Sequence, residues 1–124
     1  MTMDAMRIAR ATYQAYVDKD REALEALIAD DFHFTSPLDN RLDRRTYFER
    51  CWPNSERIAE FGFMHMVPDG DRLIVTYEGR TTEGRGFRNT EILTFRGQQV
   101  VDAEVYFGWA LPHQAEDGDS IPQE

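Results

Sequence analysis

The first part of the chain repeats its apolar residues with the period of an α-helix. Residues 4–18 predict an amphipathic helix, because their apolar side chains recur at spacings of three and four: Met6, Ala9, Tyr13, Tyr16 and Val17. A second helix is predicted over residues 21–29, with Asp20 as its N-cap. A third is predicted to begin after Asp43 and to end near Pro53, which cannot continue a helix.

Alternation with a period of two predicts strands in the remaining segments. A short strand, DFHFTSP (residues 31–37), is predicted between the second and third helices and ends at Pro37. Four longer strands are predicted after the third helix, over residues 57–67, 72–82, 86–96 and 99–109. Tight turns at residues 68–71 and 96–99 would join them into hairpins.

This order of elements predicts an α+β fold. Three N-terminal helices would pack on a curved, mainly antiparallel sheet, and a strongly bent sheet with helices across its open side makes a cone-shaped α+β barrel with a mouth. Concave, mostly apolar spaces of this kind bind small ligands. We expect a single domain over residues 1–112, followed by an acidic and flexible tail over residues 113–124.

Composition narrows the classes of partner. The chain has 124 residues with 41% apolar side chains, enough for one domain with its own core. Its net charge of −9 argues against nucleic acid or an anionic membrane as a partner. Cys51 is the only cysteine, so no disulfide forms within the chain, and the N-terminal segment does not resemble a signal peptide. No apolar run approaches the ~18 residues of a membrane span, and a cytoplasmic protein is expected.

The last predicted strand divides its side chains between two faces. One face is apolar and is expected to line the cone: Val101, Ala103, Val105, Phe107 and Trp109. The other face is mixed: Val100, Asp102, Glu104 and Tyr106. A mixed outer face that carries an exposed tyrosine suits a dimer interface as readily as it suits solvent.

One carboxyl stands on the more apolar face of the strand RNTEILTF. Asn89, Glu91 and Leu93 share that face at a spacing of two. Burial of a carboxyl is costly unless it is paired or neutralised, and it raises the pKa of the carboxyl. Perturbed carboxyls gather at functional sites, although structural ion pairs perturb them too. The structural alternative is an ion pair with a nearby arginine, for which the candidates are Arg44, Arg45 and Arg57.

The other candidates are a histidine and a group of aromatic side chains. His65 shares a face with Phe61 and Phe63 and could reach the cavity, although a lone histidine in a strand more often makes a structural hydrogen bond. The aromatic candidates for a pocket lining are equally candidates for the core: Tyr13, Tyr16, Phe48, Trp52, Tyr77, Phe107 and Trp109. No histidine or cysteine pair has metal-ligand spacing and no phosphate or dinucleotide loop is present, so neither a metal nor a cofactor is expected.

Three segments occur in a recognisable order: YQAYVDKDREALEALIADDFHFTSP, a helix ending FERCW, and TEILTFRGQQVVDAEVYFG. This order resembles the nuclear transport factor 2-like superfamily, which includes the SnoaL-like polyketide cyclases and the ketosteroid isomerases. The resemblance extends to about Leu111. It implies a pocket under the first and third helices and a homodimer through the outer sheet face. It is specific for the fold, which hosts isomerases, cyclases, dehydratases, epoxide hydrolases and non-enzymatic binders.

The resemblance to the ketosteroid isomerases holds at some positions and fails at others. The isomerases have a general-base aspartate before the proline that ends the first strand, and this chain has Ser36 there. Their oxyanion-hole tyrosine falls at Thr12, with Tyr13 beside it, and their supporting tyrosine falls at Trp52. Glu91 stands where they carry a second, protonated acid. The resemblance therefore does not imply steroid isomerisation.

Two functions are compatible with these residues. The first is a SnoaL-like enzyme that performs acid–base isomerisation, cyclisation or dehydration on a small apolar or aromatic molecule, with Glu91 as proton donor or acceptor. Asn89 and His65 would orient the substrate. The further side chains expected to contact it are Tyr13, Tyr16, Ser36, Trp52, Tyr77, Phe107 and Trp109. The second function is a non-catalytic binding module or dimeric accessory module with the same fold.

Overall fold

The structure, a computed structural model, describes residues 2–123. Its helices are α1 (Thr2–Asp18), α2 (Arg21–Leu27), α3 (Arg44–Arg50) and a short 3₁₀ helix, η1 (Trp52–Arg57). Its strands are β1 (Ile28–Ser36), β2 (Asp39–Asp43), β3 (Ile58–Asp69), β4 (Arg72–Thr81), β5 (Gly86–Arg96) and β6 (Gln99–Leu111).

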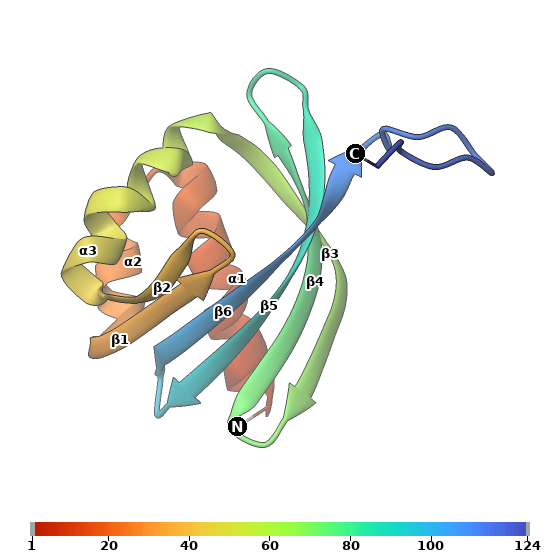
Figure 1. Ribbon diagram of the computed structural model, residues 1–124. Helices are drawn as coiled ribbons and strands as arrows, with labels where there is room; N and C mark the ends of the chain where they lie inside the picture. The colour runs from red at the N-terminus through yellow and green to blue at the C-terminus, as the bar shows by residue number, and fades with distance from the viewer. Residues whose placement is uncertain (1, 124) are drawn as a thin grey trace.

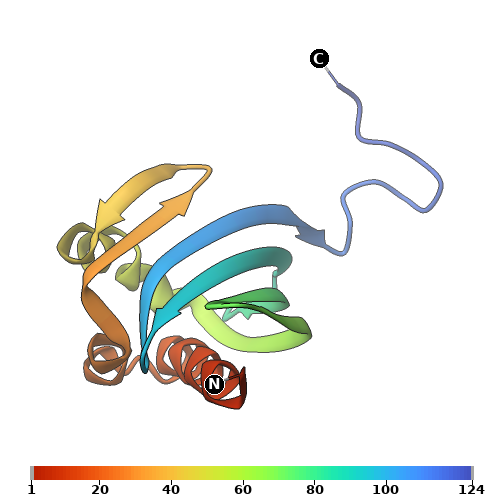
Figure 2. The same cartoon turned by 90° about the horizontal axis from the view of Figure 1, so that it is seen from below.

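The strands form one six-stranded sheet in the order β2-β1-β6-β5-β4-β3. β1 runs parallel to β6, and the other neighbouring pairs are antiparallel. Figure 1 and Figure 2 show a strongly bent sheet with the helices on its concave side. The predicted α+β architecture is confirmed, with the difference that the sheet stays open between its edge strands, β2 and β3.

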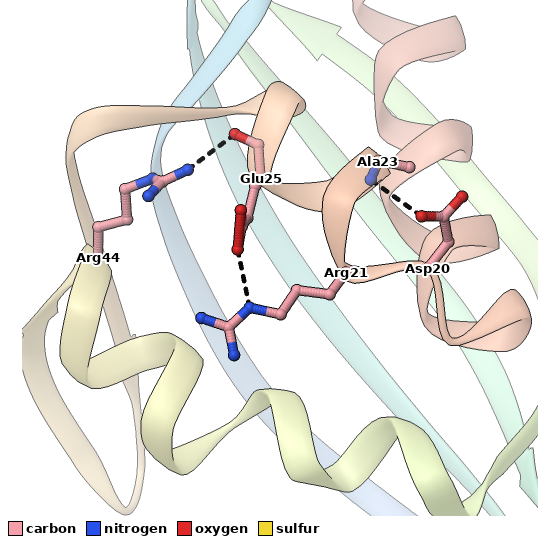
Figure 3. Close-up of polar contacts among 5 residues, drawn as sticks. All are labelled: Asp20, Arg21, Ala23, Glu25 and Arg44. Atoms are coloured by element: carbon pink, nitrogen blue, oxygen red, sulfur yellow. Dashed lines mark hydrogen bonds and ion pairs between the residues drawn. The ribbon is translucent and has the colours of Figure 1, made fainter.

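The two short helices are held by the caps that the sequence predicts and by one link between them. Asp20 accepts a hydrogen bond from the backbone N–H of Ala23 at the start of α2. Asp43 does the same for Thr46 at the start of α3. The guanidinium of Arg44 donates to the carbonyl oxygen of Glu25, which ties the start of α3 to α2 (Figure 3). Such caps contribute about 0.5–2 kcal/mol each to helix stability.

The core lies between the helices and the concave face of the sheet. Ile8 of α1, Leu24 of α2 and Phe32 of β1 are buried there with Leu73 and Val75 of β4. Full burial of side chains of this size stabilises the fold by about 1.5–3 kcal/mol each.

The prediction that the second helix runs to residue 29 is wrong. The helix ends at Leu27, and Ile28 has extended backbone angles and pairs with Val100 in the parallel ladder between β1 and β6. Ile28 is buried in that position. The sheet pairing prevails because the helical preference of a β-branched residue is weak.

No strand is predicted between Pro37 and the third helix, but residues 39–43 form β2. Their sequence, DNRLD, has low strand propensity. The strand forms because Leu42 pairs with Phe34 of β1 and is buried, with Arg41 beside it in a left-handed conformation at φ 48°. Tertiary packing therefore overrides the local preference.

The predicted faces of β6 are reversed at its beginning. Thr94 pairs with Asp102 and Phe95 pairs with Val100, so Val101 is an extra residue in a β-bulge. Val100, expected on the outer face, is only 1% exposed, whereas Val101 is partly exposed. Alternation resumes after the bulge, so that Ala103 and Val105 face inward as expected.

After β6, residues 112–123 extend away from the body of the molecule, as Figure 2 shows.

Gly108 of β6 approaches its neighbour so closely that a side chain has no room there. A Cβ at this position would overlap the carbonyl oxygen of Arg88 in β5. Gly108→Ala is therefore expected to lower the free energy of unfolding by about 1–3 kcal/mol in urea denaturation. Gly62→Ala in β3 is the matched control, because a Cβ there meets nothing within 4 Å. Equal stability of the two variants would contradict the close approach of β5 and β6.

Candidate functional site

A cavity of about 250 Å³ is lined by residues of the sheet's concave face and of α1 and α3. Its lining is mostly aromatic and aliphatic. Tyr13 and Tyr16 come from α1, Tyr47 from α3, and Tyr77 from β4. Phe107 of β6 also lines the cavity but is 52% exposed, which places it at the mouth.

Glu91 is the carboxyl on β5 that faces this cavity. Its partners across the neighbouring strands are Val75 and Val105, which are both buried. The hydroxyl of Tyr77 donates to its Oε2 at 2.7 Å. Glu91 is partly buried and lines the cavity.

A chain of hydrogen bonds orients this carboxyl. Asn89 donates from Nδ2 to the hydroxyl oxygen of Tyr77 at 3.4 Å, and its Oδ1 accepts from the backbone N–H of Gly108 at 3.3 Å. The backbone of β6 thus donates a hydrogen bond to Asn89, Asn89 donates one to Tyr77, and Tyr77 donates one to Glu91. Asn89 and Tyr77 are residues that the sequence predicts for the site, and the structure brings both to Glu91.

Burial raises the pKa of Glu91 from 4.5 to about 7, against the opposing effect of the Tyr77 hydrogen bond. The nearby hydroxyl of Tyr13 opposes the rise more weakly. None of the ion pairs among residues 2–123 includes Glu91. The arginines proposed as partners do not pair with it: Arg44 bonds to the carbonyl oxygen of Glu25, Arg45 pairs with Glu49, and Arg57 is in none of the ion pairs of the described residues. The structural alternative of an ion pair is therefore wrong.

Tyr13 is a buried side chain with unused hydrogen-bonding capacity. Its ring packs against Phe61, Phe63 and Tyr77 with centroids 5.1–5.2 Å away, and it lines the cavity. Its hydroxyl has no partner of normal hydrogen-bond geometry within the described chain. Burial, and then the charge of Glu91, raises the pKa of Tyr13 well above its usual value, so the hydroxyl keeps its proton. It lies beside Glu91 and lowers the pKa of that carboxyl.

Tyr16 and Tyr47 form a second polar group on the cavity wall. Their hydroxyl oxygens are 2.6 Å apart. Burial raises the pKa of each. The two hydroxyls hold two hydrogens and share one hydrogen bond, so one donor remains available to a ligand. Sequence reasoning selected Tyr16 but missed Tyr47, whose only signal was its place in the predicted third helix.

Asp39 and Cys51 line the cavity and were also missed. Ser36 donates from Oγ to Oδ2 of Asp39 at 2.9 Å, across the hairpin of β1 and β2. Asp39 lies between the predicted first strand and the predicted third helix, where the sequence shows no strand pattern that would place a side chain in the cavity. Burial, and then the charge of Asp39, raises the pKa of Cys51 to about 11, so the thiol stays protonated at neutral pH and is a poor nucleophile.

Three predicted residues lie outside the cavity lining. Trp52 packs edge-on against Tyr16, with ring centroids 5.1 Å apart, and so supports the wall from behind. His65 is exposed, because a bulge between Phe63 and His65 reverses the alternation of β3. These two residues are placed differently from the prediction that they contact a ligand in the cavity.

Trp109 is the third, and another bulge explains its position. Phe87 pairs with Ala110 and Asn89 pairs with Phe107, so that β6 has one residue more than β5 in this interval. Trp109 is 49% exposed, under the guanidinium of Arg88 at 5.4 Å, in a shallow groove outside the cavity. It does not line the cavity as predicted.

Within the described residues, no three or more His, Cys, Asp or Glu side chains are grouped so that they could hold a metal ion. Among residues 2–123, no helix has the length and apolarity needed to cross a membrane.

The sequence profile of the SnoaL-like domain matches residues 9–103, which is most of the chain. The chain belongs to the SnoaL-like domain family. This SnoaL-like chain has the fold of the nuclear transport factor 2-like superfamily. No curated protein matches it by sequence.

Solved structures with the same fold include enzymes and an artificial protein. An LEH-like epoxide hydrolase from M. tuberculosis is 18% identical, with a TM-score of 0.72, over 86% of this chain and 84% of that chain. A ketosteroid isomerase candidate from Kribbella flavida DSM 17836 is 15% identical, with a TM-score of 0.73, over 98% and 93%. A de novo designed protein with a curved β-sheet is 8% identical, with a TM-score of 0.74, over 86% of each chain. Identities this low establish the fold and not the reaction.

The raised pKa of Glu91 makes the stability of this SnoaL-like domain depend on pH. The folded chain keeps a proton that the unfolded chain loses near pH 4.5, so stability falls as pH rises from 4.5 through 7. The loss attributable to Glu91 is about 3 kcal/mol at most. Urea denaturation at pH 4.5 and pH 8 measures it, and Glu91→Gln is expected to remove this part of the difference. The same pH dependence in both proteins would contradict the raised pKa.

Proposed function

We propose that the cavity binds a small, largely apolar or aromatic molecule and that Glu91 donates a proton to it or accepts one from it. The observation that carries this proposal is a carboxyl that lines an aromatic cavity, is hydrogen-bonded by Tyr77, and forms no ion pair within residues 2–123. Groups of this kind concentrate at functional sites.

A pKa of about 7 suits Glu91 to proton transfer in either direction. Both its charged and its neutral form are populated near neutral pH, where a general acid or base is most effective. The spare hydroxyl donor of the Tyr16–Tyr47 pair suits an oxygen on which negative charge develops. Together they support chemistry that moves a proton at a carbon or oxygen of the ligand.

Asp39 supplies a second carboxylate to the same cavity, held by Ser36. A reaction that takes a proton from one position of a ligand and returns it to another can use two such groups, one as base and one as acid. This pair supports isomerisation, cyclisation or dehydration as the reaction class. Steroid isomerisation is not proposed, because Ser36 stands where those isomerases have their base.

Replacement of Glu91 tests the proton-transfer role. Glu91→Gln is expected to slow proton exchange about 10²–10⁴-fold without unfolding the domain. The measurement is NMR of hydrogen–deuterium exchange next to the carbonyl group of small cyclic and aromatic ketones. Glu60→Gln is the matched control, since Glu60 is an exposed carboxylate on β3. Exchange at the parent rate in Glu91→Gln would remove Glu91 from the chemistry. Binding of the ketones without exchange in the parent protein would favour the non-catalytic alternative.

That alternative is a binding or dimeric accessory module, and the outer face of the sheet supports a homodimer. Tyr106 is 53% exposed there. Its neighbours across the strands, Thr76 and Thr90, bond to each other through their hydroxyls at 2.8 Å. Ile74 and Ile92 continue this face and are only partly buried. Apolar and hydroxyl groups around an exposed tyrosine suit a protein interface.

Native mass spectrometry of protein purified from its source tests the dimer and any bound molecule together. The expected result is a dimer that retains a small molecule. Tyr106→Glu is expected to give a monomer, because it places a second negative charge in the interface beside Glu104, whose carboxylate accepts a hydrogen bond from Tyr106. Ile121→Glu is the control, since Ile121 is exposed in the segment after β6 and is not among the residues that line the cavity. A monomeric parent protein would contradict the dimer.

A further inference from the structure

The cavity contains acidic groups and no basic ones. Glu91 and Asp39 line it, whereas none of the described lining residues is lysine, arginine or histidine. An ionised carboxylate in apolar surroundings is costly until a countercharge approaches it. The net charge of −9 adds a field that repels anions and attracts cations. A cationic ligand would therefore supply the charge that the cavity lacks.

The hydrogen-bonding groups in the cavity point to the same class of ligand. An ionised carboxylate has about four acceptor positions, and Tyr77 uses one of those on Glu91. The hydroxyl of Tyr13 has no partner among residues 2–123 although the side chain is more than nine-tenths buried. An ammonium group brings three N–H donors and no acceptor. The unused acceptor positions on Glu91 match those donors.

The cavity wall beside Glu91 is aromatic. Tyr13, Phe61 and Tyr77 pack together there with ring centroids 5.1–5.4 Å apart. Aromatic rings attract cations through their quadrupoles and also pack well against hydrocarbon. An organic cation satisfies both properties, because its charge and its carbon skeleton are covalently joined.

We propose that this cavity takes a small amine, bound as its ammonium ion with the nitrogen at the Glu91 carboxylate and the carbon skeleton among the aromatic side chains. This inference rests on the ligand-binding half of the proposed function and names the chemical class of the ligand. It does not depend on proton transfer by Glu91.

The pH dependence of binding separates an amine from a neutral ligand. The titratable groups that share the cavity with Glu91 are Tyr13, Tyr16, Asp39, Tyr47, Cys51 and Tyr77. The tyrosines and the thiol have pKa values raised by burial and stay neutral at pH 8. Glu91, with a pKa of about 7, gains its charge between pH 6 and pH 8, while an alkylamine stays protonated, as lysine does. Ammonium binding should therefore strengthen about tenfold over this interval.

Three probes of similar size test the proposal by isothermal titration calorimetry on the full chain at pH 6 and pH 8. They are 2-phenylethylamine, the neutral 2-phenylethanol and the anionic phenylacetate. The amine is expected to bind about tenfold more tightly at pH 8, the alcohol to gain nothing, and phenylacetate not to bind. Glu91→Gln should weaken amine binding at least about tenfold and remove its pH dependence, with alcohol binding retained. Glu60→Gln, on the exposed surface of β3, should leave amine binding as in the parent protein.

Each contrary result has a distinct meaning. Amine binding no tighter than alcohol binding at pH 8, or tighter at pH 6 than at pH 8, overturns the amine and leaves the cavity as a binding site. Loss of amine binding in Asp39→Asn but not in Glu91→Gln also overturns it, because the wrong carboxylate would hold the nitrogen. Failure of all three probes to bind overturns both this inference and the proposed binding function. If circular dichroism shows that Glu91→Gln is unfolded, the amine proposal is decided by comparing the affinities of the amine and the alcohol for the parent protein.

Discussion

The rest of the structure depends on one constraint: a single bent sheet is covered by helices that are too few to fill its concave side. Along β4 the concave face passes from Leu73 and Val75, which are completely buried, to Tyr77, which borders the cavity. Helix α1 closes the space over these residues through Tyr13. Large aromatic side chains allow this because a ring can pack by its edge on one neighbour and leave its polar end in an open space. The core and the cavity are therefore two ends of one continuous surface.

Glu91 shows how an ionisable side chain is accommodated on that mostly apolar surface. Val75 and Val105 on the neighbouring strands leave it without water on two sides. Its hydrogen bond from Tyr77 comes from a neutral donor, which stabilises the carboxylate less than an arginine would. A pKa near neutrality follows from this incomplete compensation. A buried ion pair would have held the carboxylate permanently charged and removed its capacity to respond to a ligand or to pH.

The sequence was sufficient to predict which side chains face the cavity wherever the alternation of apolar and polar residues along a strand continued without interruption. β4 and β5 pair without a register shift, so Asn89 and Glu91 share a face as predicted, and both are hydrogen-bonded to Tyr77 of β4. β3 and β6 contain bulges, and each bulge reverses the faces beyond it, so the positions predicted for His65 and Trp109 are wrong. A bulge depends on how two strands fit together, which the pattern of one strand does not contain. For the same reason Asp39 escaped notice, since β2 exists only through its pairing with β1.

The parallel pairing of Ile28 with Val100 joins segments that are far apart in the chain. Loop closure over such a distance costs more entropy than closure of the local hairpins of β3 to β6. β6 also supplies Val100, Ala103, Val105 and Phe107 to the cavity lining. A chain in which β6 has not paired with β1 and β5 therefore lacks one wall of the cavity, and a molecule that binds there stabilises the finished domain over any state without that strand in place.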